Sequence, residues 1–197
     1  FPNCRLETKL SGAFKNGAFI YSNKDIVGNI QYQIDETINF IKTNIHQSIF
    51  ITGKAEHDRY WDYPISAIRE TITNAICHRD YGSSHTIQIK IFEDRIIIDS
   101  PGALPFDMSL SMLMKDYHPS RPRNKIIAQA FYDMHLTEFY GSGIKRIREE
   151  CKTNGNAFPT FQEQMNTFTT TYLPRQNNGQ TSNKVYTGVE MLYKLIK

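Results

Sequence analysis

Three polar side chains that could do chemistry together recur at four-residue intervals: Glu70, Asn74 and His78. Residues four apart share one face of an α-helix, so a helix here would present a carboxylate, an amide and an imidazole in a row. A carboxylate can orient or deprotonate a water molecule, and an amide oxygen is a hard ligand that Mg²⁺ accepts. The alternative interpretation of such a row is a solvated polar face.

The residues around this row predict the helix that would position it. Pro64 suits a first helical turn, because its missing N–H would have no partner there. The isoleucines then fall at helical spacing and form one apolar stripe along Ile65, Ile68, Ile72 and Ile76. His78 has a second interpretation, as part of a hydrogen-bonded junction with Arg79 and Asp80 before the turn at Gly82.

A second candidate site is the turn Gly141-Ser142-Gly143, which precedes a helix predicted over residues 144–151. Such a turn exposes backbone N–H groups at the positive end of a helix dipole and is suited to phosphate. Lys145 and Arg146 would add positive charge. Taken alone, the glycine pair is equally typical of an ordinary helix-entry turn.

Two arginines in a proline-rich segment, Arg121 and Arg123, have two interpretations. They could reach phosphates as part of a lid, or they could be solvated. The pattern does not predict a regular structure for residues 103–122.

The remaining pattern predicts the scaffold. Helices are expected over residues 25–44 and 124–134, with Asn23 or Asp25 capping the first and Asn124 the second. Strands are expected over residues 47–52 and 167–173, and a hairpin over residues 87–99. This order predicts an α+β fold, a two-layer sandwich of helices on a mostly antiparallel sheet.

Composition narrows the class of protein. The chain has 197 residues, of which 40% are hydrophobic, enough for one good core. A net charge of +3 is compatible with nucleic acid but too weak to argue for it. The three cysteines are widely separated, which argues against zinc and disulfides and favours a reducing, cytoplasmic setting. No apolar run approaches membrane-spanning length. The start at Phe1 indicates a piece of a longer protein.

Three motifs in order resemble the nucleotide-binding motifs of the GHKL ATPases, the gyrase, Hsp90, histidine kinase and MutL type. They are the Glu70/Asn74 pair on a helix, the turn that begins at Asp99-Ser-Pro-Gly102, and the Gly141-Ser142-Gly143 turn. In those proteins the first motif activates water and binds magnesium. The second holds adenine, and the third holds phosphates. The resemblance implies the GHKL (Bergerat-like) fold.

A closer resemblance is to the C-terminal domain of proteins labelled RecG-related ATP-dependent DNA helicase, which is grouped with the GHKL-like ATPases. The motifs that carry it are Tyr63-Pro64, Arg69-Glu70, Asn74-Ala75, His78 to Tyr81, Ser100-Pro101-Gly102, Ser120 to Asn124, and Gly141 to Ile144. The resemblance covers roughly residues 20–175 and rests on the motifs in combination.

The resemblance implies a domain order for the chain. Residues 1–21 would be the tail of a preceding DNA-binding domain of the AlbA_2 (Schlafen-like) type, or a linker. Residues 22–175 would be the GHKL-like ATP-binding domain. Residues 176–184 would be a linker, and residues 185–197 the start of a winged-helix domain.

The resemblance also implies a site for ATP and Mg²⁺. Glu70 would be the catalytic carboxylate, and Asn74 would hold the Mg²⁺. Adenine would lie at Asp99, and the phosphates at the glycine turn. The expected nucleotide-binding residues are Asn74, His78, Asp99, Gly102, Arg121, Gly141, Ser142 and Gly143.

The function that follows is an ATP-binding module of a DNA-binding transcriptional regulator, with slow Mg²⁺-dependent hydrolysis left open. DNA would be bound through flanking domains, the protein would be a homo-oligomer, and no membrane would be involved. Nucleotide would order the Gly141 turn and residues 108–123. The absence of a G-x-x-x-x-G-K-[ST] loop argues against a helicase motor.

The alternative function is a degenerate domain that binds no nucleotide and serves as a dimerisation or spacer unit of the same regulator. Pro101 and Ala103 stand where the GHKL pattern has glycines, and this departure favours the alternative. The intact pair of Glu70 and Asn74, together with the Gly141 turn, favours nucleotide binding.

Overall fold

The computed structural model describes residues 6–14, 17–50, 58–115, 121–136, 141–176 and 183–185. Its main sheet has six strands in the order β2-β1-β5-β6-β8-β7. The bounds are β1 Leu6–Phe14, β2 Gly17–Ile26, β5 Ile87–Ile91, β6 Ile96–Pro101, β7 Thr160–Gln164 and β8 Thr167–Tyr172. A second sheet has the order β4-β3-β9, with β3 Gln47–Phe50, β4 Asp58–Trp61 and β9 Asn183–Val185.

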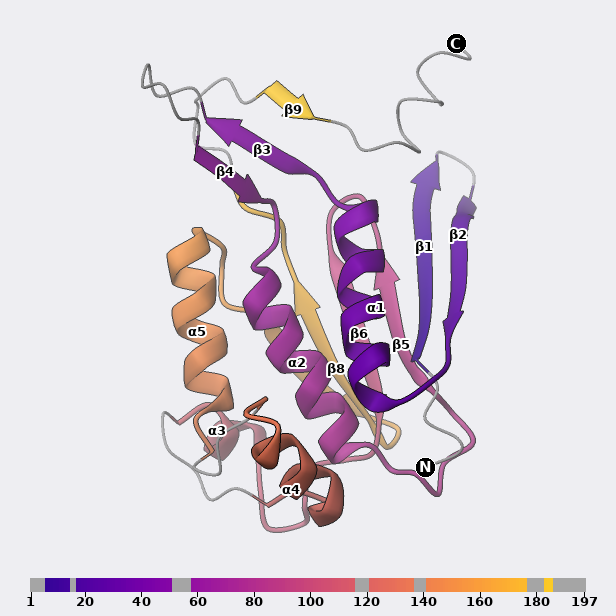
Figure 1. Cartoon of the computed structure of the whole chain (residues 1–197), viewed down its shortest axis with the longest axis vertical. Helices are drawn as coiled ribbons and strands as arrows, with labels where there is room; N and C mark the ends of the chain where they lie inside the picture. Colours follow the sequence, from indigo (N-terminus) through magenta and orange to yellow (C-terminus); the bar gives the residue numbers. More distant parts are fainter. Residues whose placement is uncertain are drawn as a thin grey trace.

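The helices form the second layer. Their bounds are α1 Ile30–Asn44, α2 Ile65–His78, α3 Leu110–Leu113, α4 Lys125–Asp133 and α5 Gly143–Asn154. Helices α1, α2 and α5 lie on one face of the main sheet, with α2 between the other two (Figure 1). The predicted α+β sandwich is confirmed. The main sheet is mostly antiparallel, and the exception is the parallel pairing of β1 with β5.

Isoleucine fills the space between the two layers. Each fully buried side chain of this size contributes roughly 1.5–3 kcal/mol relative to exposure. The sheet alternates buried and partly exposed positions along β5 and along β6 as far as Ser100, as a sheet with one covered face requires. The buried isoleucines are Ile26, Ile34, Ile38, Ile41, Ile45, Ile68, Ile72, Ile76, Ile87, Ile89, Ile91, Ile96, Ile98, Ile127, Ile144 and Ile147.

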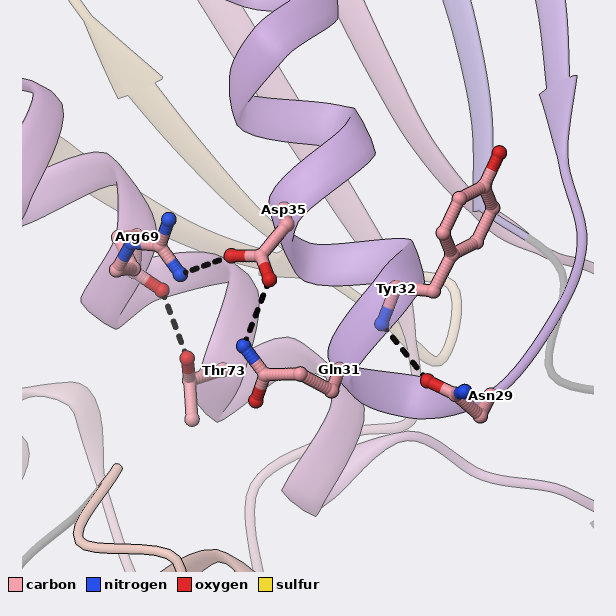
Figure 2. Close-up of polar contacts among 6 residues, drawn as sticks. All are labelled: Asn29, Gln31, Tyr32, Asp35, Arg69 and Thr73. Carbon is pink, nitrogen blue, oxygen red and sulfur yellow. Dashed lines mark hydrogen bonds and ion pairs between the residues drawn. The ribbon is translucent and has the colours of Figure 1, made fainter.

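The first helix begins at Ile30, later than the predicted start at Asp25. The Oδ1 atom of Asn29 accepts a hydrogen bond from the backbone N–H of Tyr32 at 2.8 Å (Figure 2), which makes Asn29 the N-cap. Asn23 and Asp25, the predicted caps, lie instead in β2, where they pair with β1. The prediction placed the cap too early because the strand runs up to the turn before the helix.

Polar contacts fix α1 against α2. The Asp35 carboxylate accepts hydrogen bonds from Gln31 Nε2 at 2.8 Å and from Arg69 Nη1 at 2.9 Å (Figure 2). The Gln31 hydrogen bond, with help from Arg69, lowers the pKa of Asp35. Because Arg69 turns toward α1, the next residue, Glu70, lies on another face of α2.

The start of α4 is tied to the end of α2. Asn124 occupies the predicted N-cap position, but its side chain makes no cap bond to α4. Its Nδ2 atom instead donates to the carbonyl oxygens of Cys77 at 2.9 Å and Arg79 at 2.8 Å. Asn124 therefore satisfies carbonyl groups that the last turn of α2 would leave unpaired.

Two of the expected domain boundaries, one near each end of the chain, fall within strands of the structure. The limit between residues 21 and 22 falls inside β2, and the β1–β2 hairpin forms one edge of the main sheet. Residues 183 and 184 of the expected linker belong to β9, which pairs with β3. Residues 186–197, which would begin a winged helix, lie outside the described residues.

Within the described part of the chain, no helix is both long enough and apolar enough to cross a bilayer.

Candidate functional site

A cavity of about 150 Å³ lies between the helices and one half of the main sheet. Helix α2 forms one wall, α5 with the turn before it forms a second, and β6, β7 and β8 form a third. The segment after β6 and the helix α3 complete the lining. The charged side chains in the lining are Glu70, Arg121 and Arg146.

Two side chains predicted from the sequence, Glu70 and Asn74, are in contact on the α2 wall. Asn74 Nδ2 donates to Oε1 of Glu70 at 3.2 Å, and Arg146 Nη2 lies 3.3 Å from Oε2 of Glu70. Glu70 is buried, and a buried carboxylate requires such partners. Since the N–H side of the Asn74 amide faces Glu70, its Oδ1 oxygen is directed away from the carboxylate and can serve as a ligand.

Gly143, the first residue of α5, lies directly against this pair. A Cβ atom at Gly143 would lie 2.7 Å from Oε1 of Glu70 and 3.1 Å from Nδ2 of Asn74. Only glycine therefore allows this approach without moving those groups. Ser142 holds the N-cap position of α5 but does not cap the first turn with its side chain. Gly141 has a φ of 66°, a left-handed conformation that glycine adopts readily.

The structure brings most of the predicted residues to this one cavity. Ser142 lies between two lining residues and is not itself part of the lining. Arg121 forms an ion pair with Asp107 at the cavity. The predicted residues in the lining are Glu70, Asn74, His78, Gly102, Arg121, Gly141 and Gly143.

Asp99 is the predicted residue that the structure places elsewhere. Ile98 and Ser100 line the cavity, and side chains alternate along a strand, so Asp99 projects from the opposite face of the sheet. There its carboxylate accepts from Lys90 Nζ at 2.7 Å and from the Thr169 hydroxyl at 2.6 Å. Asp99 therefore cannot make the expected contact with adenine in this cavity. Ser100 has the cavity-facing position at the end of the strand.

The segment that follows β6 is held by the tip of the β7–β8 hairpin. The backbone N–H of Gly102 donates to the Asn166 carbonyl at 2.7 Å, and that of Ala103 donates to the Asn166 side chain at 3.0 Å. The N–H of Leu104 donates to Glu163 at 3.2 Å. Gly102 has a φ of 120°, which disfavours any other residue. The cavity rim thus has a fixed backbone.

The wall of the cavity formed by β6, β7 and β8, here called the sheet wall, was not predicted from the sequence. Phe161 and Phe168 line it with ring centroids 5.9 Å apart, together with Ile98 and Thr170. The sequence of β6 does not predict which of its side chains face the helices, because Ile96, Ile97 and Ile98 are all apolar and show no alternation. Arg146 was recognised only as added charge, although its position one turn after Gly143 places it on the same side of the helix.

Other chemistries find little support. Burial raises the pKa of the Cys77 thiol to about 12, so this residue of α2 is a poor nucleophile. Among the described residues, no group of three or more His, Cys, Asp or Glu side chains could hold a metal ion. A cation here would need ligands from the bound molecule or from water.

The cavity fits a phosphate-bearing ligand in two respects. The Arg146 Nε atom is buried and has no hydrogen-bond partner among the described residues. A buried guanidinium donor without an acceptor is unfavourable, and a phosphate oxygen would satisfy it. The space above Gly143, which any side chain would fill, is the second feature, because phosphates bind at glycine-containing helix starts.

Comparisons with known proteins identify a related family and a similar fold. Residues 84–172 match the family HATPase_c_4, described as "Putative ATP-dependent DNA helicase recG C-terminal". A comparison with curated proteins finds no match. The fold is similar to the crystal structure of the DIP2311 protein from Corynebacterium diphtheriae, with a TM-score of 0.74 and 20% identity. The similarity covers 89% of this chain but only 36% of that protein.

The matched residues contain the rim segment, Arg121 and the Gly141 turn, and they begin after α2. Glu70 and Asn74 thus lie outside the match but face the same cavity as the matched motifs. The resemblance that the motifs predicted is confirmed for residues 84–172, which match the family model of the RecG-related C-terminal domain.

Proposed function

We propose that this domain binds a nucleoside triphosphate together with Mg²⁺. The observation that carries the proposal is the convergence of Asn74 on α2 and the turn before α5 on a single cavity. These groups lie far apart in the sequence, and a triphosphate with its cation needs both kinds of group at once. ATP is the nucleotide that the family description names.

Asn74 and the three charged residues of the cavity each have a role in this proposal. The N-terminal N–H groups of α5 and the Arg146 guanidinium bind phosphate oxygens, and Arg121 adds positive charge from the opposite segment. The Asn74 Oδ1 atom is a ligand for Mg²⁺, which when bound neutralises phosphate charge. Glu70, one turn before Asn74, orients a water molecule for slow hydrolysis.

The wider role is a further part of the proposal and goes beyond what the family description states. We place this domain in a DNA-binding transcriptional regulator that binds DNA through flanking domains and is a homo-oligomer. Nucleotide binding would order the Gly141 turn and residues 108–123, and so change the contacts between subunits or domains. Translocation along DNA is not proposed, since the chain lacks a motor motif.

One observation favours a second candidate, a domain that keeps the fold without binding nucleotide. The carboxylate of Glu70 is already paired with Asn74 and Arg146, so the protein itself supplies the partners of this carboxylate. In that case the domain serves as a dimerisation or spacer unit. The experiment that separates the two candidates is a binding measurement.

We expect a non-hydrolysable ATP analogue with Mg²⁺ to raise the melting temperature of the wild-type domain. A ligand that binds only the folded state stabilises it by about 2.7 kcal/mol at a hundredfold its Kd. Asn74→Ala removes the Mg²⁺ ligand, so we expect about tenfold weaker binding in Mg²⁺ and no change when Mg²⁺ is chelated. Differential scanning fluorimetry over a range of nucleotide concentrations measures both.

The matched control is Asn39→Ala, which removes the same side chain from an exposed position on α1. It should behave as wild type. Absence of a shift in all three proteins would support the spacer function. A shift that Asn74→Ala leaves unchanged would refute the Mg²⁺ assignment. Where binding is seen, Glu70→Ala should retain it and abolish any phosphate release.

A further inference from the structure

The sheet wall of the cavity carries hydroxyl groups and, among the described residues, no carboxylate. Its side chains are those of Ile98, Ser100, Phe161, Phe168 and Thr170. The cationic groups proposed for phosphate come from α5 and from the segment at Arg121. If the nucleotide binds as proposed, its base would lie against the sheet wall, since the aromatic and aliphatic side chains there suit a planar ring.

Asp99, the carboxylate expected at the base, cannot reach it. Asp99 projects from the opposite face, and its two oxygens are bound by Lys90 at 2.7 Å and Thr169 at 2.6 Å. The register confirms the separation, because Asp99 pairs with Thr169 while the cavity-facing Ile98 pairs with Thr170. Turning Asp99 to the cavity face would break both of these contacts and the hydrogen bonds between β6 and β8.

The position at the end of β6 belongs to Ser100. Its side chain is buried, and its hydroxyl donates to the Ala75 carbonyl on α2 at 3.2 Å. Ser100 pairs with Phe168, so the hydroxyl lies beside an aromatic ring that also lines the cavity. The hydroxyl oxygen keeps acceptor lone pairs while it donates to Ala75, and its one hydrogen can turn to another acceptor by leaving that carbonyl.

We propose that Ser100 is the residue that faces the base, and that its hydroxyl lets the cavity accept adenine and guanine nucleotides with similar affinity. This inference rests on the proposed nucleotide binding. A carboxylate only accepts hydrogen bonds, so it favours the amino group of adenine and opposes the oxygen that guanine has in the same place. A hydroxyl can accept a hydrogen bond from the adenine amino group and can donate one to the guanine oxygen. Strong discrimination needs a buried group that the wrong base would leave unpaired, and a rotatable hydroxyl does not provide it.

The test compares the affinities of non-hydrolysable ATP and GTP analogues with Mg²⁺, measured by isothermal titration calorimetry on the whole chain. We expect the wild-type affinities to agree within about tenfold. Ser100→Asp should favour the adenine analogue by at least a further tenfold, mainly through weaker binding of the guanine analogue. Asp99→Asn, on the far face, should leave the ratio of the two affinities unchanged.

Two results would overturn this inference while leaving the proposed function intact. One is a wild-type preference for the adenine analogue of a hundredfold or more. The other is loss of such a preference in Asp99→Asn. Failure of both analogues to bind the wild type would instead refute the nucleotide site itself. Should Ser100→Asp fail to fold, Ser100→Ala serves in its place, and it should weaken both analogues by the same factor.

Discussion

Replacing Gly143 by valine is expected to abolish nucleotide binding while the domain stays folded. The Cβ atom alone would lie 2.7 Å from Glu70 Oε1 and 3.1 Å from Asn74 Nδ2. Both contacts are with the ends of side chains, which can move, so the fold tolerates the change. The proposed cation ligand and the space for phosphate are lost together, and we expect at least a hundredfold weaker binding. The stabilisation of about 2.7 kcal/mol expected at a hundredfold the wild-type Kd should disappear.

Ser66→Val is the matched control, because it places the same side chain at an exposed position in the first turn of α2. It should keep the nucleotide-induced shift of the wild type. Far-ultraviolet circular dichroism of both variants checks that the helices are retained. A shift of wild-type size in Gly143→Val would mean that the ligand binds elsewhere.

The largest effect on stability is expected for Phe131→Ala. Phe131 is fully buried on the inner side of α4 and belongs to the core. Truncating a buried phenylalanine removes its packing and leaves a cavity, which typically costs about 3–5 kcal/mol. Urea denaturation should show a lower midpoint with an unchanged slope.

Ile126→Ala, on the same helix, provides the comparison. Ile126 is 75% exposed, so its truncation should change the free energy of unfolding by no more than about 0.5 kcal/mol. Equal losses in the two variants would show that the inner face of α4 is not packed against the core as described.

The periodic parts of the fold could be predicted from the sequence alone. Isoleucines at spacings of three and four identified α1 and α2, because a helix with one covered face must repeat its apolar residues at that interval. The hairpin of β5 and β6 followed from alternation and a two-residue turn. Local patterns of this kind need no knowledge of the partner that covers them.

Elements whose character depends on distant partners were harder to predict. β7 is mostly exposed, so its sequence lacks the apolar alternation of a covered strand. It is identified as a strand by its pairing with β8 in the structure. β4 was not predicted from the sequence, yet it forms over Asp58–Trp61 and pairs with β3. The hairpin of β1 and β2 shows no sign of the pairing with β5.

The residues of the candidate site also differ in how well the sequence predicted their positions. The helical spacing of Glu70 and Asn74 predicted that they share a face, and they do. The glycine turn was predicted to face the same space and lines the cavity. Asp99, which the resemblance assigned to adenine, lies on the face of the sheet away from the cavity. The run of isoleucines before it does not show which face of the strand is covered, and a register change of one residue reverses every side chain.

The parallel pairing of β1 with β5 has a consequence for the order of folding. It joins Leu6 to Ile87 across most of the amino-terminal half of the chain, whereas β5 and β6 are neighbours in sequence. Closing so long a loop carries an entropic penalty that a local hairpin avoids. The amides of β1 should therefore gain protection from hydrogen exchange later than those shared by β5 and β6, and the edge of β5 is open until they do.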